Sequence, residues 1–258
     1  MTTPENTYRH PFHSFFDCWL VELNNNLEKL VSAANHHHED DDINDDPDSY
    51  SLIDKAVGHY EEYYKAKSDG ANDVLSMFLP PWLTTLEDSF LWIGGWRPTT
   101  AVHLLYSKSG IQLEARLADL VPQLNCRDLG DLTSNQMKRI DELQKKTIGE
   151  ERVISEKMAR LQESAADTSM VDLSNMESEM IRKNEYHGRK DSDEKVESAL
   201  NGKNDKLVEM LRMADGLRIE TLKSVVEILT PLQAMYFLIA AAELHLRLHD
   251  WGMKKDAA

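Results

Sequence analysis

Two histidines near the end of the chain have the spacing best suited to binding a ligand. His245 and His249 are four residues apart in the apolar stretch LQAMYFLIAAAELHLRLHDWG. In a helix this spacing places both imidazoles on one face, in line with Met235, Leu238 and Ala242. The pair is therefore a candidate binding site. The competing interpretation is that both are core or rim histidines hydrogen-bonded to local partners.

The other polar clusters favour no catalytic or metal site. His36 to His38 stand beside a run of acidic residues, but consecutive residues in a loop make a poor preformed metal site, and a linker is favoured. Glu87 and Asp88 are adjacent, so on a helix they would point about 100 degrees apart, which does not suit paired acid–base catalysis. The chain has no GxSxG, no phosphate-binding glycine loop and no HExxH. We therefore predict a protein that is not an enzyme.

Composition narrows the class further. The 258 residues carry a formal charge of −16, which opposes binding to a nucleic-acid backbone or an anionic membrane. No apolar run is long enough to cross a bilayer, and the polar start is not a signal peptide. The two cysteines, Cys18 and Cys126, cannot make a disulfide framework, and Cys18 is expected to be a buried thiol. The expected location is the nucleus, the cytoplasm or both.

A tryptophan-rich corner organises the elements that would position these side chains. Its defining residues are Trp92, Gly94, Gly95, Arg97 and Pro98. The two glycines should stop a preceding helix, since glycine enters left-handed backbone freely. Proline can restart a helix in its first turn, where a missing amide is harmless. The stretch is therefore predicted to be a tight helix–turn–helix corner.

The surroundings of this corner are predicted to be structural. The preceding helix should carry an apolar stripe of Leu83, Leu86, Phe90 and Ile93. Trp82, Trp92 and Trp96 could shape a pocket or a partner surface, although packing is favoured. For Arg97, an ion pair with Glu87 or Asp88 is expected ahead of a binding role.

The remaining pattern predicts one all-α domain, a helical bundle with long acidic and polar loops. Thr133 with Gln136, and Thr230 with Gln233, have the spacing of capping boxes and should start two late helices. The helix after Thr133 is long enough to pack in the bundle or to pair with a second copy in a homodimer. We expect residues 1–7 to be disordered, residues 8–255 to form the domain, and residues of about 35–48 and 168–204 to be flexible loops. The second loop should hold one short helix near Met176 to Lys183.

The corner FLWIGGWRP and the ending ADGLRIETLKSVVEILTPLQAMYFLIAAAELHLRLHDWG resemble one known family. It is the Delay-of-Germination, or seed dormancy control, domain of plants, which also forms the C-terminal half of TGA-type bZIP transcription factors. The resemblance covers about Tyr8 to Trp251, and the final LHLRLHDWG is closer to the dormancy branch. The chain is thus identified as a stand-alone member without the bZIP segment.

The resemblance implies a regulatory protein that docks other proteins in seed-dormancy, developmental or stress signalling and in transcription regulation. Dormancy-branch members engage protein phosphatases of hormone signalling, and TGA relatives dimerise and recruit co-regulators. Direct DNA binding is the disfavoured alternative, because the first 54 residues hold only Arg9 and Lys29 as basic side chains and no basic helix.

The resemblance also implies a haem-binding sensor as the rival hypothesis. In the dormancy branch a histidine pair in the matching stretch is implicated in haem binding, so His245 and His249 inherit that role as a hypothesis. Axial ligands approach one iron from opposite faces of the porphyrin, whereas neighbours on one helix approach from the same side. At most one of the two is therefore expected to ligate a given iron, with the other supporting it or acting in a dimer.

Overall fold

The computed structural model describes residues 11–37, 47–69, 73–118, 129–183 and 189–258, and all regular structure in these ranges is helical. The all-α prediction is therefore confirmed. The elements in chain order are α1 Pro11–His37, α2 Pro47–Asp69, α3 Val74–Phe78, α4 Thr85–Asp88, α5 Thr99–Ala118, the 3-10 turn η2 Leu129–Asp131, α6 Ser134–Glu163, the 3-10 turn η3 Ser164–Ala166, α7 Thr168–Lys183, α8 Arg189–Ile228 and α9 Pro231–Asp256. Within the described ranges, no helix combines the length and hydropathy needed to cross a bilayer.

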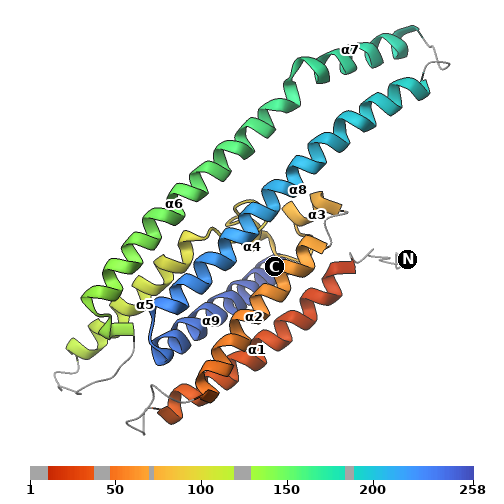
Figure 1. Cartoon of the computed structure of the whole chain (residues 1–258). Helices are drawn as coiled ribbons and strands as arrows, with labels where there is room; N and C mark the ends of the chain where they lie inside the picture. The colour runs from red at the N-terminus through yellow and green to blue at the C-terminus, as the bar shows by residue number, and fades with distance from the viewer. Residues whose placement is uncertain (1–10, 38–46, 70–72, 119–128, 184–188) are drawn as a thin grey trace, which may run out of the picture.

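Helix α9 lies at the centre of the bundle. Its first half is apolar on most sides, and Met235, Phe237 and Leu238 are all at most 1% exposed. Helices α1, α2 and α5 and the second half of α8 pack around it (Figure 1). A helix that is hydrophobic all round can only be stable when it is covered in this way.

The starts of α6 and α9 are joined through their capping boxes. The side chain of Thr133 accepts from the amide of Gln136, and the side chain of Thr230 accepts from the amide of Gln233, as predicted. The two glutamines also meet, since Gln136 Nε2 donates to Gln233 Oε1 over 2.7 Å. Two local signals in the sequence therefore fix one contact of the tertiary structure.

Helices α6 and α8 continue side by side well beyond the bundle, and α7 lies at their far end (Figure 1). We call the part from Ser155 to Glu209 the distal arm. Its described residues bury no hydrophobic side chain, because the buried hydrophobic residues of α6 end at Ile154 and those of α8 begin at Met210. The described hydrophobic contacts of the arm are thus at most partly buried.

Several predicted elements differ from the structure. Residues 168–204 are expected to be a loop with one short helix, but α7 and the start of α8 make the described part of this range helical. Asp167 Oδ1 accepts from the amide of Met170 over 2.9 Å and so starts α7. Cys18 is exposed, not buried. The predicted disordered 1–7 and most of the predicted loop 35–48 lie outside the described residues.

The corner forms by a tighter turn than predicted. The expected helix from Leu83 to Ile93 is confined to α4, after which the backbones of Trp92 and Gly95 pair across the turn. Ile93 and Gly94 at its centre have φ values of 47° and 68°. Two consecutive positive φ angles are typical of a type I′ turn, which reverses the chain in two residues.

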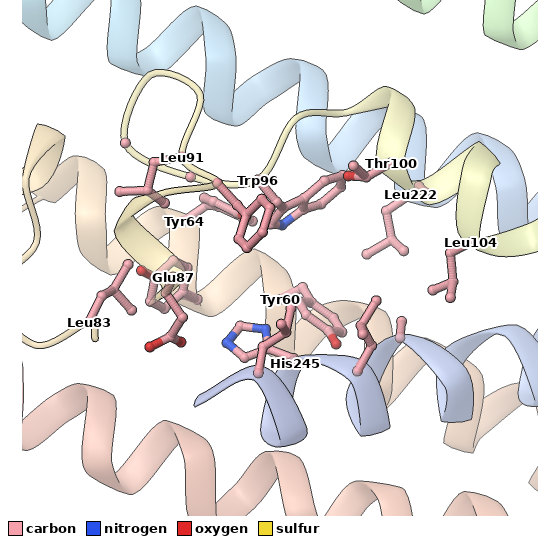
Figure 2. A pocket seen from close by; sticks show the side chains of 18 of the residues that line it. Tyr60, Tyr64, Leu83, Glu87, Leu91, Trp96, Thr100, Leu104, Leu222 and His245 are labelled. Atoms are coloured by element: carbon pink, nitrogen blue, oxygen red, sulfur yellow. The ribbon is translucent and has the colours of Figure 1, made fainter. Parts of the chain in front are cut away.

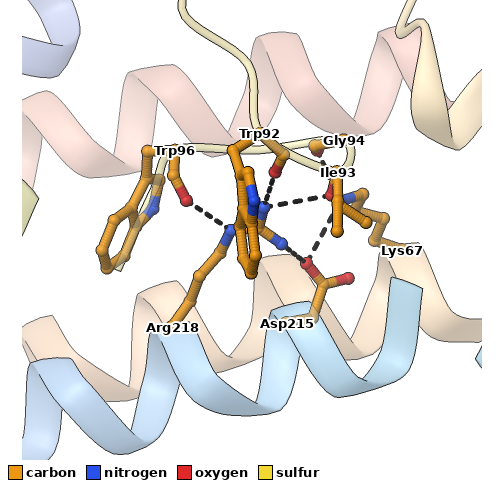
Figure 3. Close-up of polar contacts among 7 residues, drawn as sticks. All are labelled: Lys67, Trp92, Ile93, Gly94, Trp96, Asp215 and Arg218. Carbon is orange, nitrogen blue, oxygen red and sulfur yellow. Dashed lines mark hydrogen bonds and ion pairs between the residues drawn. The ribbon is translucent and has the colours of Figure 1, made fainter. Parts of the chain in front are cut away.

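A buried ionic cluster of Lys67, Asp215 and Arg218 holds this turn in place (Figure 3). Arg218 Nε donates to the carbonyl of Trp96 over 2.7 Å, and its Nη2 donates to the carbonyls of Trp92 and Ile93. Lys67 Nζ donates to the carbonyl of Gly94 over 2.6 Å. The turn carbonyls therefore receive charged donors from α2 and α8 in place of water.

Asp215 balances the two cations of this cluster. Its Oδ1 accepts from Lys67 Nζ over 3.2 Å and from Arg218 Nη1. Lys67 and Arg218 are fully buried and Asp215 is almost so. Sequence reasoning missed this cluster, although an acid and an arginine three residues apart inside the apolar stripe of α8 were a visible signal.

Candidate functional site

A cavity of about 200 Å³ lies between the corner and the face of α9 that carries His245 (Figure 2). Most of its wall is apolar and aromatic, and it includes Trp19, Tyr60, Tyr64, Trp96 and Phe237. Gly94 and Gly95 also line it, so the clamped turn shapes one side of the cavity directly.

His245 points into this cavity from α9 (Figure 2). Its ring lies 5.1 Å from the ring of Trp19, and neither ring nitrogen has a hydrogen-bond partner among the described residues. Burial lowers the pKa of His245 to about 4, because a charged imidazole would lose its hydration there. At neutral pH it is an uncharged imidazole with an unused donor and an unused acceptor.

His249 has a different environment from His245, although both lie on one face of α9. Its Nδ1 is 3.0 Å from Glu87 Oε2, and this hydrogen bond raises the pKa of His249. Burial would raise the pKa of Glu87, but the hydrogen bonds from His249 and Thr84 outweigh burial and lower it. The predicted alternative of a histidine bound to a local partner thus describes His249 and does not describe His245.

Glu87 is fixed by the capping box of α4. Its Oε2 accepts from the backbone amide of Thr84 over 2.8 Å and from the Thr84 hydroxyl over 2.7 Å. Helix α4 in turn packs on the end of α9, where Thr85 N donates to Asp256 Oδ2 over 2.9 Å. A Cβ at Gly252 would lie well under 3.0 Å from the Thr84 hydroxyl, so only glycine permits this approach.

The opposite wall is fixed by Trp19 and His59. Trp19 Nε1 donates to the carbonyl of His59 over 2.9 Å, and His59 Nε2 lies 2.9 Å from the carbonyl of Trp19. The two rings stack at 4.8 Å with an interplanar angle of 5°. Burial lowers the pKa of His59. These contacts hold α1 against α2 and position Trp19 in the cavity wall.

The expected ion pair of Arg97 with Glu87 or Asp88 is not found among the described residues. Arg97 Nε instead donates to Glu151 Oε2, on α6, over 2.7 Å. Glu151 Oε1 also accepts from the amide of Thr99 over 2.7 Å. A buried carboxylate therefore caps the start of α5 just after Pro98, where the helix dipole favours negative charge.

The tryptophans divide between packing and cavity. Trp82 is buried with its ring 4.4 Å from that of Phe12, and Trp92 Nε1 donates to Ser155 Oγ over 3.0 Å. Only Trp96 of the three lines the cavity. In the described ranges no group of three His, Cys, Asp or Glu side chains is arranged to hold a metal ion.

The two histidines should affect stability in opposite directions as pH changes. Because the folded pKa of His245 is about 4, below its ordinary 6.5, stability rises with pH between these values. The raised pKa of His249 gives a contribution that is complete below 6.5 and is lost as pH rises through the folded value. We expect His245→Leu to make the acid side of the stability curve shallower, as measured by urea unfolding at a series of pH values.

The matched control for this prediction is His103→Leu, because His103 is exposed on α5. It should keep the acid slope of the unmodified protein. An acid slope in His245→Leu as steep as that of the control would contradict the neutral state assigned to His245.

Comparison with known proteins gives one family. The family model described as seed dormancy control matches residues 26–107. Protein DOG1-like 1 of Arabidopsis thaliana is 32% identical over 82% of this chain and 80% of its own length. Protein DOG1-like 4 of the same plant is 30% identical over 99% of this chain and 97% of its own length.

A transcription factor is also related to the chain. Transcription factor TGA2 of Arabidopsis thaliana is 31% identical over 89% of this chain, which spans 60% of that protein. The relation to both groups agrees with the resemblance seen in the corner and in the last two helices. The chain belongs to the seed dormancy control family of DOG1-like proteins.

Proposed function

We propose that this chain is a non-catalytic regulatory protein that acts by docking other proteins, in the nucleus or the cytoplasm. The matching family model is described as seed dormancy control, and one relative is a transcription factor. Both support a role in seed-dormancy, developmental or stress signalling and in transcription regulation. Signalling and transcription-regulatory proteins are its proposed partners, with protein phosphatases of hormone signalling as the first candidates.

The observation that carries this proposal is the composition of the distal arm. Its described part has no buried hydrophobic residue, yet Val171, Ile181 and Leu200 are 46%, 73% and 45% exposed. A pair of helices that extends from a bundle without forming a core of its own gains apolar burial by contacting a partner.

Methionine side chains of α7 can adapt to a partner. Met170, Met176 and Met180 of α7 are only partly covered, and unbranched methionine side chains adjust to different surfaces. Polar contacts between the helices of the arm include the hydrogen bond from Lys203 Nζ to the Ser164 carbonyl over 2.6 Å and the ion pair of Lys157 Nζ with Glu209 over 3.6 Å. Exposed ion pairs of this kind stabilise weakly, so the arm can rearrange at low cost.

The test places a charge on the arm and an equal charge elsewhere. Ile181→Asp lies in α7, and Val21→Asp lies in α1, where Val21 is 64% exposed. We expect Ile181→Asp to weaken binding to purified phosphatases at least about tenfold in surface plasmon resonance, with Val21→Asp unchanged. Equal loss in both variants, or none in either, would contradict docking through the arm. Substrate turnover by the purified chain would contradict its non-catalytic role.

A haem sensor using His245 and His249 is the second candidate. It is favoured by the uncharged, unpaired imidazole of His245, which is the form that ligates iron. Two features oppose it. His249 Nδ1 is engaged by Glu87, and the cavity of about 200 Å³ is smaller than the roughly 300–1,000 Å³ of pockets that enclose drug-sized ligands.

The cavity as it stands therefore does not fit a buried porphyrin. Titration of the purified protein with haemin, followed by absorbance, tests this candidate. A haem-protein Soret band that is lost when both histidines are changed to alanine would support it. A band that survives the double change would end it.

A further inference from the structure

Two polar groups of the cavity have unused hydrogen-bonding capacity. All three described hydrogen bonds to the Glu87 carboxylate go to Oε2, which leaves Oε1 without a partner among the described residues. Both nitrogens of His245 are unpaired in the same sense. Glu87 and His245 both line the cavity and point into it (Figure 2). These atoms face the cavity, where water or a bound molecule can serve as their hydrogen-bond partner.

The rest of the cavity sets the size and character of that partner. An apolar protein cavity of about 150 Å³ holds a benzene-sized molecule, so about 200 Å³ accommodates one or two fused rings. The rest of the wall is mostly aromatic and aliphatic and includes Tyr60, Leu104 and Leu222. Phe90 and Leu244 line the cavity and are 66% and 43% exposed, so an apolar molecule can enter beside them.

The charge states of Glu87 and His245 determine which polar group a ligand can carry. The Glu87 carboxylate is already paired with His249, and a second carboxylate beside it would be repelled. His245 adds no positive charge to receive an anion, because burial keeps its pKa low. A hydroxyl group suits both partners, since it can donate to a carboxylate oxygen and accept from an imidazole N–H.

We propose that this cavity binds a small, uncharged, mostly apolar molecule of one or two rings that carries a hydroxyl group, with Glu87 Oε1 and His245 as its hydrogen-bond partners. This site is separate from the docking proposal, because none of the residues used lies in the distal arm. It is also independent of iron and can be tested on metal-free protein.

The first test compares three probes of one shape on the unmodified protein by isothermal titration calorimetry at neutral pH. The probes are 2-naphthol, naphthalene and 2-naphthoate, which present a hydroxyl, no polar group and a carboxylate. We expect 2-naphthol to bind at least about tenfold more tightly than either of the others, as one hydrogen bond to a charged group predicts. Equal affinities for 2-naphthol and naphthalene, tighter binding of 2-naphthoate, or no binding of any probe would overturn the proposal.

The second test uses variants of the cavity. Ala241→Phe fills it from α9, because Ala241 is one of its lining residues, and should abolish the heat of 2-naphthol binding. His245→Leu should weaken 2-naphthol binding by about twofold to tenfold, because the hydrogen bond to His245 is lost while that to Glu87 remains. His103→Leu on the exposed face of α5 should leave the affinity unchanged. Unchanged binding of 2-naphthol by folded Ala241→Phe would place the ligand elsewhere. If that variant fails to fold, the comparison of the three probes alone decides.

Discussion

Asp215→Asn is expected to lower the free energy of unfolding by about 3–5 kcal/mol, the range measured when one partner of a buried ion pair is removed. The change keeps the shape of the side chain but removes the only described anion bonded to two fully buried cations, Lys67 and Arg218. These cations hold the carbonyls of the corner. Loss of their counter-charge should therefore loosen the turn as well as destabilise the protein. Urea unfolding at neutral pH measures the effect.

The matched control is Asp250→Asn. Asp250 is 40% exposed and pairs with Lys254 Nζ over 2.7 Å on the surface of α9, so its loss should change stability by less than about 1 kcal/mol. A similar, small effect for both aspartates would show that the buried cluster does not depend on its anion.

The difference in stability between the unmodified protein and Asp215→Asn should also become smaller as pH rises. Burial already lowers the pKa of Lys67 to about 8, although Asp215 raises it in part. Without Asp215 the pKa of Lys67 should fall further, so the native variant loses this proton at lower pH than the unmodified protein does. Since the unfolded chain keeps the proton, the variant gains stability relative to the unmodified protein as pH rises toward about 8.

Gly94→Ala is the second substitution for which we expect a large loss, of about 2–4 kcal/mol. Gly94 has a φ of 68°, which is unfavourable for alanine. An added Cβ would also lie well under 3.0 Å from the carbonyl oxygen of Met77, which is backbone and cannot swing away. Because Gly94 lines the cavity, the same change should weaken any ligand bound there.

Gly149→Ala is the control for this prediction. Gly149 lies in α6, and an added Cβ would meet nothing within 4 Å. Alanine favours helix over glycine by about 0.8–1.0 kcal/mol, so this variant should be slightly more stable than the unmodified protein. Thermal unfolding of both variants measures whether Gly94→Ala lowers the stability and Gly149→Ala raises it. Equal losses at the two glycines would contradict the role given to the turn.

The parts of the fold that sequence predicts correctly depend on local signals. Thr133 and Thr230 start their helices because each interacts with a glutamine three residues later. The corner is predicted only in part. The two glycines indicate a turn, but isoleucine is not a residue type that predicts the positive φ found at Ile93. That conformation is held by Arg218, 125 residues further along the chain, and no local pattern could indicate it.

The helices of residues 168–204 show a different limit of sequence reasoning. The segment is rich in polar and charged residues, which is typical of a loop, yet α7 and the start of α8 form there. Pairs such as Glu179 with Lys183, at 3.7 Å, and the contact between neighbouring helices supply what the segment lacks alone. The signal that could have been used was Asp167, a good first residue for a helix.

The candidate site was predicted in its residues but not in its chemistry. Spacing places His245 and His249 on one face of α9, and the structure keeps them there. Burial lowers the pKa of His245, whereas the pKa of His249 is raised by Glu87, which bonds to it across 162 positions of sequence. Sequence reasoning considered Glu87 only as an acid next to Asp88 or as a partner of Arg97, so the polar pair facing the cavity was missed.

The described part of the distal arm has no buried hydrophobic residue. This affects which parts of the protein unfold locally. Amide protons of α7 and of the first turns of α8 should exchange with solvent through small local openings, while those of α9 should wait for global unfolding. The arm and the bundle then behave as two cooperative units joined through the same continuous helices. A protease should therefore cut the arm near its far end first and leave the bundle folded.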